Sequence, residues 1–328
     1  MKKIFGAAGV WLKIRGGVRP YVPLLANISA TLIFSFAYLF TSVGLKVVGY
    51  DAVKFLAFRF TLGFIILSLL LVTGFQKVDY RKKPFRLLLL CGLLNPCVSQ
   101  VLETSAIAYA PTSQMAVMFS VLPVCVVVLS IFINRERPTK RQALFMSFSV
   151  AGVLLVNLVD GQMEGGTVQG IIIITGAIFV ISLQRVYIRR ASGSFTAFET
   201  IYVTTGMGAV SFSAATLLTH ASGGRLGNFF DGLLTPDFII PILYMGIMSC
   251  VVAFLFFTYA AGRLPIAVAN STGMAGTIIT VSVGVFVLHE KFRLIDVVGT
   301  AVILFGIVGV VLNYDAHVSN RYNLRNKN

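Results

Sequence analysis

Charged side chains are scarce in this sequence of 328 residues, in which Asp, Glu, Lys and Arg together make up only 12%. Soluble domains carry about 25%. Hydrophobic residues make up 57%, and the mean hydropathy is +0.87. A soluble fold of this size could not cover its surface with so few charges, because exposed positions in soluble proteins are mostly polar or charged. The composition therefore excludes an ordinary soluble domain.

Cysteine and histidine are also few, and none stands in a catalytic or metal-binding pattern. No CxxC, HExxH or paired Cys/His spacing occurs, so we expect no metal site and no cofactor. No GxxxxGK[ST] loop occurs either, which excludes ATP binding by that route. We expect no catalytic residues and no enzyme activity. Four cysteines lie inside apolar runs, where they act as small buried hydrophobes: Cys91, Cys97, Cys125 and Cys250.

Long apolar runs dominate what is present. A membrane-spanning helix needs about 20 mostly apolar residues, and only a helix satisfies its own backbone groups within one such run. The runs are too long and too evenly apolar for the alternating strands of a β-barrel. They predict an all-α membrane protein with ten transmembrane helices, at 21–43, 52–72, 84–106, 112–133, 140–158, 168–189, 196–219, 237–260, 265–288 and 293–313.

The first twenty residues need a separate interpretation. They begin with Met1-Lys2-Lys3 and a short apolar stretch, as a signal peptide does. Basic residues follow that stretch, however, and no clear cleavage site intervenes. We favour an uncleaved cytoplasmic or interfacial segment over a signal peptide.

Basic residues gather in alternate loops. With the N-terminus in the cytoplasm and ten crossings, 21 of the 27 Lys and Arg residues lie on the cytoplasmic side, 5 lie outside, and Arg59 lies within the second span. Cytoplasmic loops carry such an excess. We therefore expect a multi-pass protein of the cell (inner) membrane with both termini in the cytoplasm. The same pattern accounts for the net charge of +15 without nucleic acid as a partner.

The chain also matches itself. Residues 91–152 align without gaps on 245–306, with Pro111 in register with Pro265; we call this match the repeat alignment. The first two spans of each half match more weakly, with Gly63 in register with Gly208. Each half holds five helices, an odd number, so the second half must enter the membrane from the opposite side. The pattern predicts two inverted five-helix repeats, a recurrent transporter design; a duplication kept only for packing is the alternative.

Each half ends in an apolar helix, a Glu-basic turn and a further helix. The turns read IFINRERPT at 131–139 and FVLHEKFR at 286–293, and the second continues as DVVGTAVILFG at 296–306. The first departs from this pattern, with Phe145 where the second has Gly299. In these motifs, in Phe58-Arg59-Phe60 and in AIAYAP at 106–111, the chain resembles EamA-type members of the drug/metabolite transporter superfamily.

The resemblance covers about residues 21–314. It implies ten helices around a central cavity, lined chiefly by spans 1, 3, 4, 6, 8 and 9. We divide the chain accordingly into an N-terminal segment, two EamA-like five-helix repeats and a cytoplasmic tail, at 1–20, 21–158, 168–314 and 315–328.

Ionisable groups inside the spans are candidates for the cavity wall, because such groups are costly unless they face protein or water. Glu103 is the clearest. Asn95, Ser99 and Glu103 are spaced four residues apart and should share one helix face, which Gln100 and Thr104 broaden. We expect Glu103 to bind a cationic group or to titrate with protons; a glutamate at headgroup level is the alternative.

Arg59 is the other clear ionisable residue within a span. We expect a structural ion pair or a helix-end anchor, with a substrate carboxylate as the alternative partner. Gln184, Tyr259 and Asn270 are further candidates to line the cavity, although the small-residue patch around Asn270 also suits helix packing. Pro96 and Pro123 should kink the third and fourth spans.

These features predict a secondary active transporter that exports small metabolites such as amino acids, by alternating access around a central cavity. Coupling to protons or to counter-substrate exchange would drive it. A flippase for lipid or lipid-linked substrates is the alternative, with a channel or scaffold as a third hypothesis. The expected partners are a small-molecule substrate and membrane lipid, and no sequence pattern points to an oligomeric state.

Overall fold

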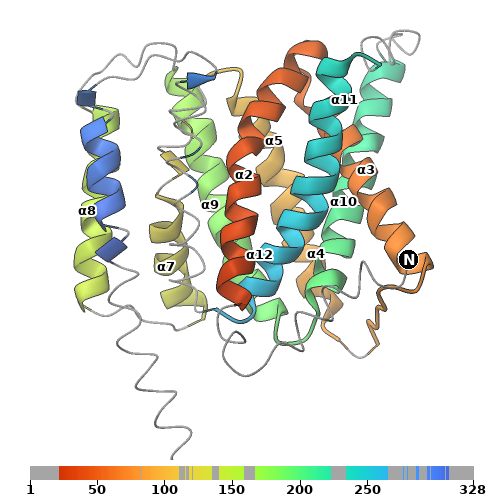
Figure 1. Cartoon of the computed structure of the whole chain (residues 1–328), viewed down its shortest axis with the longest axis horizontal. Helices are drawn as coiled ribbons and strands as arrows, with labels where there is room; N and C mark the ends of the chain where they lie inside the picture. Colours follow the sequence, from red (N-terminus) through yellow and green to blue (C-terminus); the bar gives the residue numbers. More distant parts are fainter. Residues whose placement is uncertain are drawn as a thin grey trace, which may run out of the picture.

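The structure is a computed structural model, and it describes residues 22–81, 83–110, 115, 118–119, 121–134, 140–158, 167–222, 234–264, 276, 279, 286–287, 294–295, 297–306 and 308–309. Within these ranges every regular element is a helix. Six helical segments of the described chain are long and apolar enough to cross a membrane. They stand side by side (Figure 1), so the chain is an all-α membrane protein, as predicted.

The first half follows the predicted order of spans. Helix α3 (Ala52–Val72) and helix α8 (Lys140–Leu158) have the predicted bounds. Helix α2 (Val22–Val47) runs four residues further than expected. The remaining elements are the three consecutive segments of the third span, α4 (Phe85–Gly92), η1 (Leu93–Val98) and α5 (Ser99–Ala106), and the fourth-span helix α7 (Leu122–Ile133).

The second half begins with α9 (Val168–Ala191) and α10 (Ala197–Ser222). Its third span again consists of three consecutive segments, α11 (Pro236–Leu243), η3 (Tyr244–Ala253) and α12 (Phe254–Ala261). The predicted span 265–288 lies almost wholly outside the described residues. Of the predicted span 293–313, the structure describes an apolar helix at Val297–Gly306.

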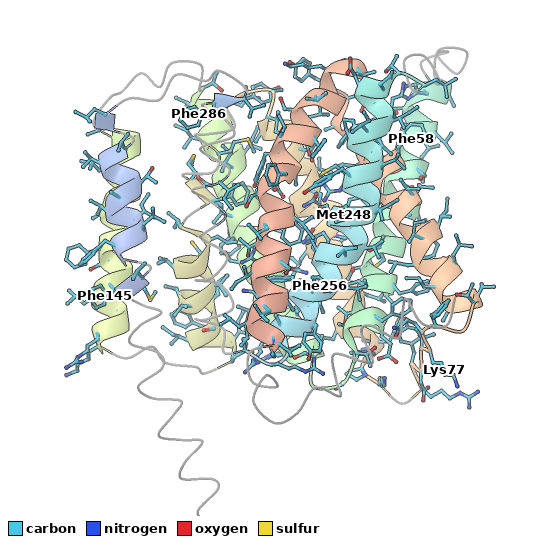
Figure 2. All side chains as sticks on the ribbon, in the orientation of Figure 1. Phe58, Lys77, Phe145, Met248, Phe256 and Phe286 are labelled. Atoms are coloured by element: carbon cyan, nitrogen blue, oxygen red, sulfur yellow. The ribbon has the colours of Figure 1, made fainter. Side chains whose placement is uncertain are left out.

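Exposed apolar side chains cover the outside of the bundle. Met248, Phe256 and Phe286 illustrate this surface, whereas the charged Lys77 lies at one end (Figure 2). Such a surface suits hydrocarbon, in which each helix satisfies its own backbone groups.

The two third spans are interrupted at equivalent places. Segments η1 and η3 are π-helical, and the repeat alignment carries Leu93–Val98 onto 247–252, inside η3. In η1 the backbone at Asn95 is non-helical (φ −144°, ψ 118°), directly before Pro96, because proline disfavours the helical conformation in the residue that precedes it. The predicted kink at Pro96 is confirmed.

The predicted kink at Pro123 is not tested, because residues 111–114, 116–117 and 120, which precede it in the fourth span, lie outside the described residues. Pro123 lies in the first turn of α7, after Val121 as the N-cap. A proline is tolerated there because the first turn has no internal acceptor for its missing N–H group.

The two third spans run in opposite directions. In Figure 1, α4 lies at the lower end of its span and α5 above it, whereas α11 lies at the upper end and α12 below it. Two halves of like structure thus pass through the bundle in opposite senses, which agrees with the predicted inverted repeat.

Helices α3 and α10, the second spans of the two halves, pack closely against third spans. A Cβ atom added at Gly63 would lie 3.0 Å from Cys250 Cβ, and one added at Gly208 would lie 2.6 Å from Pro96 Cγ. Gly63 and Gly208 are equivalent positions of the two halves, and the repeat alignment pairs Pro96 with Cys250. Glycine therefore allows the same close approach of a second span to a third span in both halves.

A salt bridge joins the two halves at one end of the bundle. Lys83 Nζ, from the α3–α4 loop, lies 2.8 Å from both carboxylate oxygens of Glu199 in α10. Glu199 also forms a capping box with Thr196 and accepts a hydrogen bond from the Asp79 N–H group, so it fixes the loop and the start of α10 together. We call Asp79, Lys83, Thr196 and Glu199 the Lys83–Glu199 clamp.

Tyr80 packs beside this clamp. Its hydroxyl donates to the Glu199 carbonyl oxygen at 3.3 Å, and its ring lies against Phe85 and Phe195. Burial, followed by the negative charge of Glu199, raises the pKa of Tyr80 to about 12. The clamp therefore couples the loop of the first half to the second half by charge, hydrogen bonds and packing.

Candidate functional site

A cavity of about 140 Å³ lies between the first and third spans of the two halves, with α3 and α7 completing its wall. A cavity of about 150 Å³ accommodates benzene, so this one suits a small molecule. Its lining includes the polar or charged residues Tyr38, Thr41, Arg59, Asn95, Gln100, Glu103, Thr104, Gln184, Arg185 and Ser249. Its apolar lining includes Phe34, Ala37, Ile107, Phe119, Leu122, Ile181, Met245, Phe254 and Phe257.

Glu103 is held by hydrogen bonds from two other helical positions. The Tyr38 hydroxyl, from α2, donates to Oε1 at 2.8 Å, and the Gln100 side-chain amide donates to Oε2 at 2.9 Å. Gln100 and Glu103 lie three residues apart on α5 and therefore face the same side. The two bonds fix the orientation of the carboxylate in the cavity wall.

Arg59 extends this network into α3. Its Nη1 donates to Gln100 Oε1 at 2.7 Å, so Gln100 bridges Arg59 and Glu103. Its Nη2 donates to Ser249 Oγ and its Nε to Cys250 Sγ, both at 3.2 Å. Arg59 is only 5% exposed. Within the described chain Arg59 makes no direct salt bridge; its link to Glu103 runs through the neutral side chain of Gln100.

Arg185 is a second cation of the cavity wall. It lies within the predicted span 168–189 and was counted only among the Lys and Arg residues of the cytoplasmic side. Arg185 lies within α9, and its guanidinium lies over the Phe257 ring, 4.8 Å from the ring centroid. Counting charges near the ends of spans cannot separate a loop arginine from one whose long side chain lies along an internal wall.

The cavity wall keeps the symmetry of the repeat. The repeat alignment pairs Asn95, Gln100 and Glu103 with Ser249, Phe254 and Phe257, and all six line the cavity. In the first spans, Phe34, Ala37 and Tyr38 have the same spacing as Ile181, Gln184 and Arg185. Tyr38 thus contacts Glu103 in the first half, and Arg185 contacts Phe257 at the equivalent place in the second half.

The other predicted site residues divide into three groups. Asn95, Gln100, Glu103, Thr104 and Gln184, all candidates for the cavity wall, line the cavity. Arg59, for which a structural ion pair or a helix-end anchor was expected, also lines it. Ser99 and Tyr259 do not belong to the lining. Asn270 lies outside the described residues.

Ser99 lies outside the cavity lining, although it shares helix α5 with Glu103. It is fully buried, and its hydroxyl has no hydrogen-bond partner among the described residues. Periodicity of four residues relates two positions only along a continuous α-helix, and η1 separates Asn95 from the α-helix that carries Glu103.

Tyr259 lies beside Arg263 at the end of α12. The Arg263 guanidinium stacks on its ring at 3.8 Å and donates to its carbonyl oxygen at 3.3 Å. Tyr259 therefore anchors the end of the span.

Four polar lining residues were not among the sequence candidates: Tyr38, Thr41, Arg185 and Ser249. Tyr38 and Thr41 could have been predicted from the sequence, because Phe34, Tyr38 and Thr41 recur at helical spacing along α2 and therefore share one face of it. Ser249 could have been found as the repeat equivalent of Asn95. Among the described residues, no group of three His, Cys, Asp or Glu side chains could hold a metal ion.

Comparison with known proteins agrees with this architecture. The model of the EamA-like transporter family matches residues 22–158 and again 168–312. The chain is 25% identical over 292 residues to YcxC of Bacillus subtilis (strain 168), named an uncharacterized transporter, covering 89% of this chain and 93% of that protein.

Two further similarities point the same way. A Clostridium kluyveri protein, also named an uncharacterized transporter, is 23% identical over 273 residues, covering 81% of this chain and 85% of the relative. A solved crystal structure superposes with a TM-score of 0.62 at 19% identity, covering 88% of this chain and 96% of the other. The structural likeness supports the fold.

Proposed function

Because the chain belongs to the EamA-like transporter family, we propose that it is a secondary active transporter that exports small polar metabolites such as amino acids. It works by alternating access: the two inverted halves rock about the cavity and open it to one side of the membrane at a time. Its relatives are named as transporters, and the family is not enzymatic.

The observation that carries this proposal is the charged cavity between the two halves. Glu103, Arg59 and Arg185 line one cavity inside the helical bundle, where charged groups mark substrate and ion pathways. The lining comes from both halves, so rocking of one half against the other would change it. A cavity kept only for packing would not need these charges.

The size of the cavity favours a small metabolite over a lipid. Pockets for drug-sized ligands occupy about 300–1,000 Å³, whereas this cavity has about 140 Å³. For this reason we propose the flippase only as the second function.

We further propose that the protein lies in the cell (inner) membrane with both termini in the cytoplasm. The support is the distribution of Lys and Arg, most of which lie on the cytoplasmic side in a ten-span topology of this orientation. In this orientation the Lys83–Glu199 clamp faces the cytoplasm. We also propose that the chain divides into an N-terminal segment (1–20), two EamA-like five-helix repeats (21–158 and 168–314) and a cytoplasmic tail (315–328).

The direct test is flux in proteoliposomes. Purified protein is reconstituted, loaded with radiolabelled amino acids one at a time, and efflux is followed with and without a pH gradient. We expect efflux of at least one amino acid above protein-free liposomes. If a proton drives it, Glu103 is the carboxylate that exchanges, and Glu103→Gln should abolish the response to the gradient.

A matched control distinguishes loss of the Glu103 charge in the cavity from loss of a carboxylate elsewhere in the protein. Asp237→Asn changes an exposed carboxylate in the first turn of α11 and should leave flux unchanged. Absence of flux for all amino acids, organic acids, nucleosides and polyamines in protein that remains folded would contradict the proposed function.

A further inference from the structure

The loop between α3 and α4, together with the first turn of α4, is rich in basic residues. The sequence KVDYRKKPFR at 77–86 holds five Lys or Arg residues and one acidic residue. Lys77, Arg81 and Arg86 are exposed, whereas Lys83 is bound to Glu199 in the clamp. Figure 2 shows Lys77 extending from the end of the bundle. We call Lys77, Arg81 and Arg86 the basic loop surface; it lies where two spans end.

Exposed apolar side chains accompany these cations along the chain. Val72, the last residue of α3, is 84% exposed, and Phe75 and Phe85 are exposed on either side of the loop. Aromatic residues at the ends of spans lie at the level of the lipid headgroups. The surface therefore combines positive charge with apolar groups at the boundary between membrane and water.

The clamp holds the backbone of this loop in one arrangement. The Asp79 N–H group donates to Glu199, and the Asp79 carboxylate accepts from the Arg81 N–H group at 3.0 Å. The Tyr80 ring lies edge-on to Phe85, with 5.5 Å between the ring centroids. A ligand of the basic loop surface therefore meets an ordered backbone, which lowers the entropic cost of binding.

From these observations we infer that the basic loop surface binds an anionic phospholipid. The headgroup phosphate binds between Lys77, Arg81 and Arg86 through charge-assisted hydrogen bonds, and the acyl chains extend along the apolar end of α3. Basic clusters directly beside a membrane span attract anionic lipids in this way. The apolar groups favour a lipid over a free phosphate ion, which has no chains to place against them. The inference does not depend on which substrate the protein transports.

A cluster that serves only to orient the chain would behave differently. Orientation depends on how many Lys and Arg residues lie on one side of the membrane, whereas lipid binding depends on which residues meet the headgroup. Lys140 and Arg141 are exposed cations in the first turn of α8, on the same side in the ten-span topology. They provide a matched control of equal charge type in a different loop.

The test measures ligand-induced stabilisation of the purified full-length protein in an uncharged detergent. Cys91 and Cys250 are buried, so a thiol-reactive fluorophore reports unfolding on heating. The protein is titrated with short-chain phosphatidylglycerol, with short-chain phosphatidylcholine, or with glycerol 3-phosphate, which carries the anion without the chains. We expect phosphatidylglycerol to raise the melting temperature at least twice as much as either of the others, and high salt to reduce the difference.

The variants then assign the binding to the basic loop surface. Lys77→Gln, Arg81→Gln and Arg86→Gln together should weaken the apparent affinity for phosphatidylglycerol by about tenfold or more, without changing the response to phosphatidylcholine. Each single variant should lose part of the affinity, which keeps the test decisive if the triple variant does not fold. Lys140→Gln combined with Arg141→Gln should keep the affinity of the wild type.

Four results would overturn the inference. Two of them are equal stabilisation by the two phospholipids and an unchanged affinity for phosphatidylglycerol when the three cations are replaced. The third is an equal loss of affinity in the Lys140 and Arg141 control, which would mean that total charge on this side, and not this surface, attracts the lipid. The fourth is equal stabilisation by glycerol 3-phosphate, which would assign the surface to a soluble phosphate.

Discussion

The Lys83–Glu199 clamp offers a prediction whose size follows from its geometry. Glu199 is 3% exposed and accepts four hydrogen bonds at 2.8 Å, two from Lys83 and two from backbone N–H groups. Removing one partner of a buried ion pair costs about 3–5 kcal/mol, because the other partner stays charged and unpaired. We expect Lys83→Met to lower the free energy of unfolding by this amount, because it leaves the buried carboxylate of Glu199 without a cation.

Lys83 is less buried, with 25% of its side chain exposed. In Glu199→Gln, water can therefore solvate part of the Lys83 ammonium that is left, and this variant should cost about 1–3 kcal/mol. The double variant should be more stable than the sum of the two losses implies. We expect a coupling energy of at least about 1 kcal/mol, above the roughly 0.3–0.5 kcal/mol found for independent sites.

The assay is a double-mutant cycle on the protein in detergent, unfolded by denaturant under fixed conditions. Lys77→Met is the control, because Lys77 is an exposed cation in the same loop and should change stability by less than about 0.5 kcal/mol. Raising the salt concentration should reduce the coupling, since Lys83 is partly in contact with solvent. A coupling energy within the range for independent sites would refute the view that this pair joins the two halves.

Three further predictions test the helix packing, the clamp and the cavity network. In denaturant unfolding, Gly208→Ala should destabilise the protein by about 1–3 kcal/mol, because the new Cβ would lie 2.6 Å from Pro96 Cγ. The control Gly176→Ala should be neutral or stabilising, because its new Cβ would lie 3.7 Å from Leu102 Cδ1. Tyr80 should ionise near pH 12 in ultraviolet titration, and Tyr80→Phe should remove that transition. Since the folded-state pKa of Tyr80 is raised, Tyr80 contributes to stability below pH 10, and this contribution is lost as the pH rises toward 12. If the wild type and Tyr80→Phe lost stability equally at alkaline pH, this prediction would be contradicted. Arg59→Lys should cost about 2–4 kcal/mol, because an ammonium cannot reproduce the forked contacts to Gln100, Ser249 and Cys250, whereas the exposed Arg86→Lys should show almost no loss in the same unfolding assay.

Much of the fold could be predicted from the sequence because the membrane constrains it strongly. Apolar runs of about 20 residues must be helices, and the bounds of α3 and α8 came from run length alone. Pro96 identified the break in the third span, since proline acts on its own neighbours. Pro123 lies in the first turn of α7, and hydropathy alone does not define where that helix begins.

The candidate site was only partly predictable. Glu103 stood out because a charge within a span is costly, whatever its partners are. Its partner Tyr38 lies 65 residues away, and no local pattern joins the two. Ser99 was a candidate by its spacing from Glu103, but it is fully buried outside the cavity lining. Arg185 was not a candidate, because its position near a span end gave no sign that its side chain lines a cavity.

The central claim is that one cavity between two inverted halves opens alternately to the two sides of the membrane. The most direct measurement places a cysteine at Gln184, which is 3% exposed in the cavity wall, after the four native cysteines have been replaced and flux has been verified. Sealed vesicles of each orientation are then treated with a membrane-impermeant maleimide. The account predicts labelling from both faces, at rates that a transported amino acid changes. Labelling from one face only, with and without the amino acid, would contradict it.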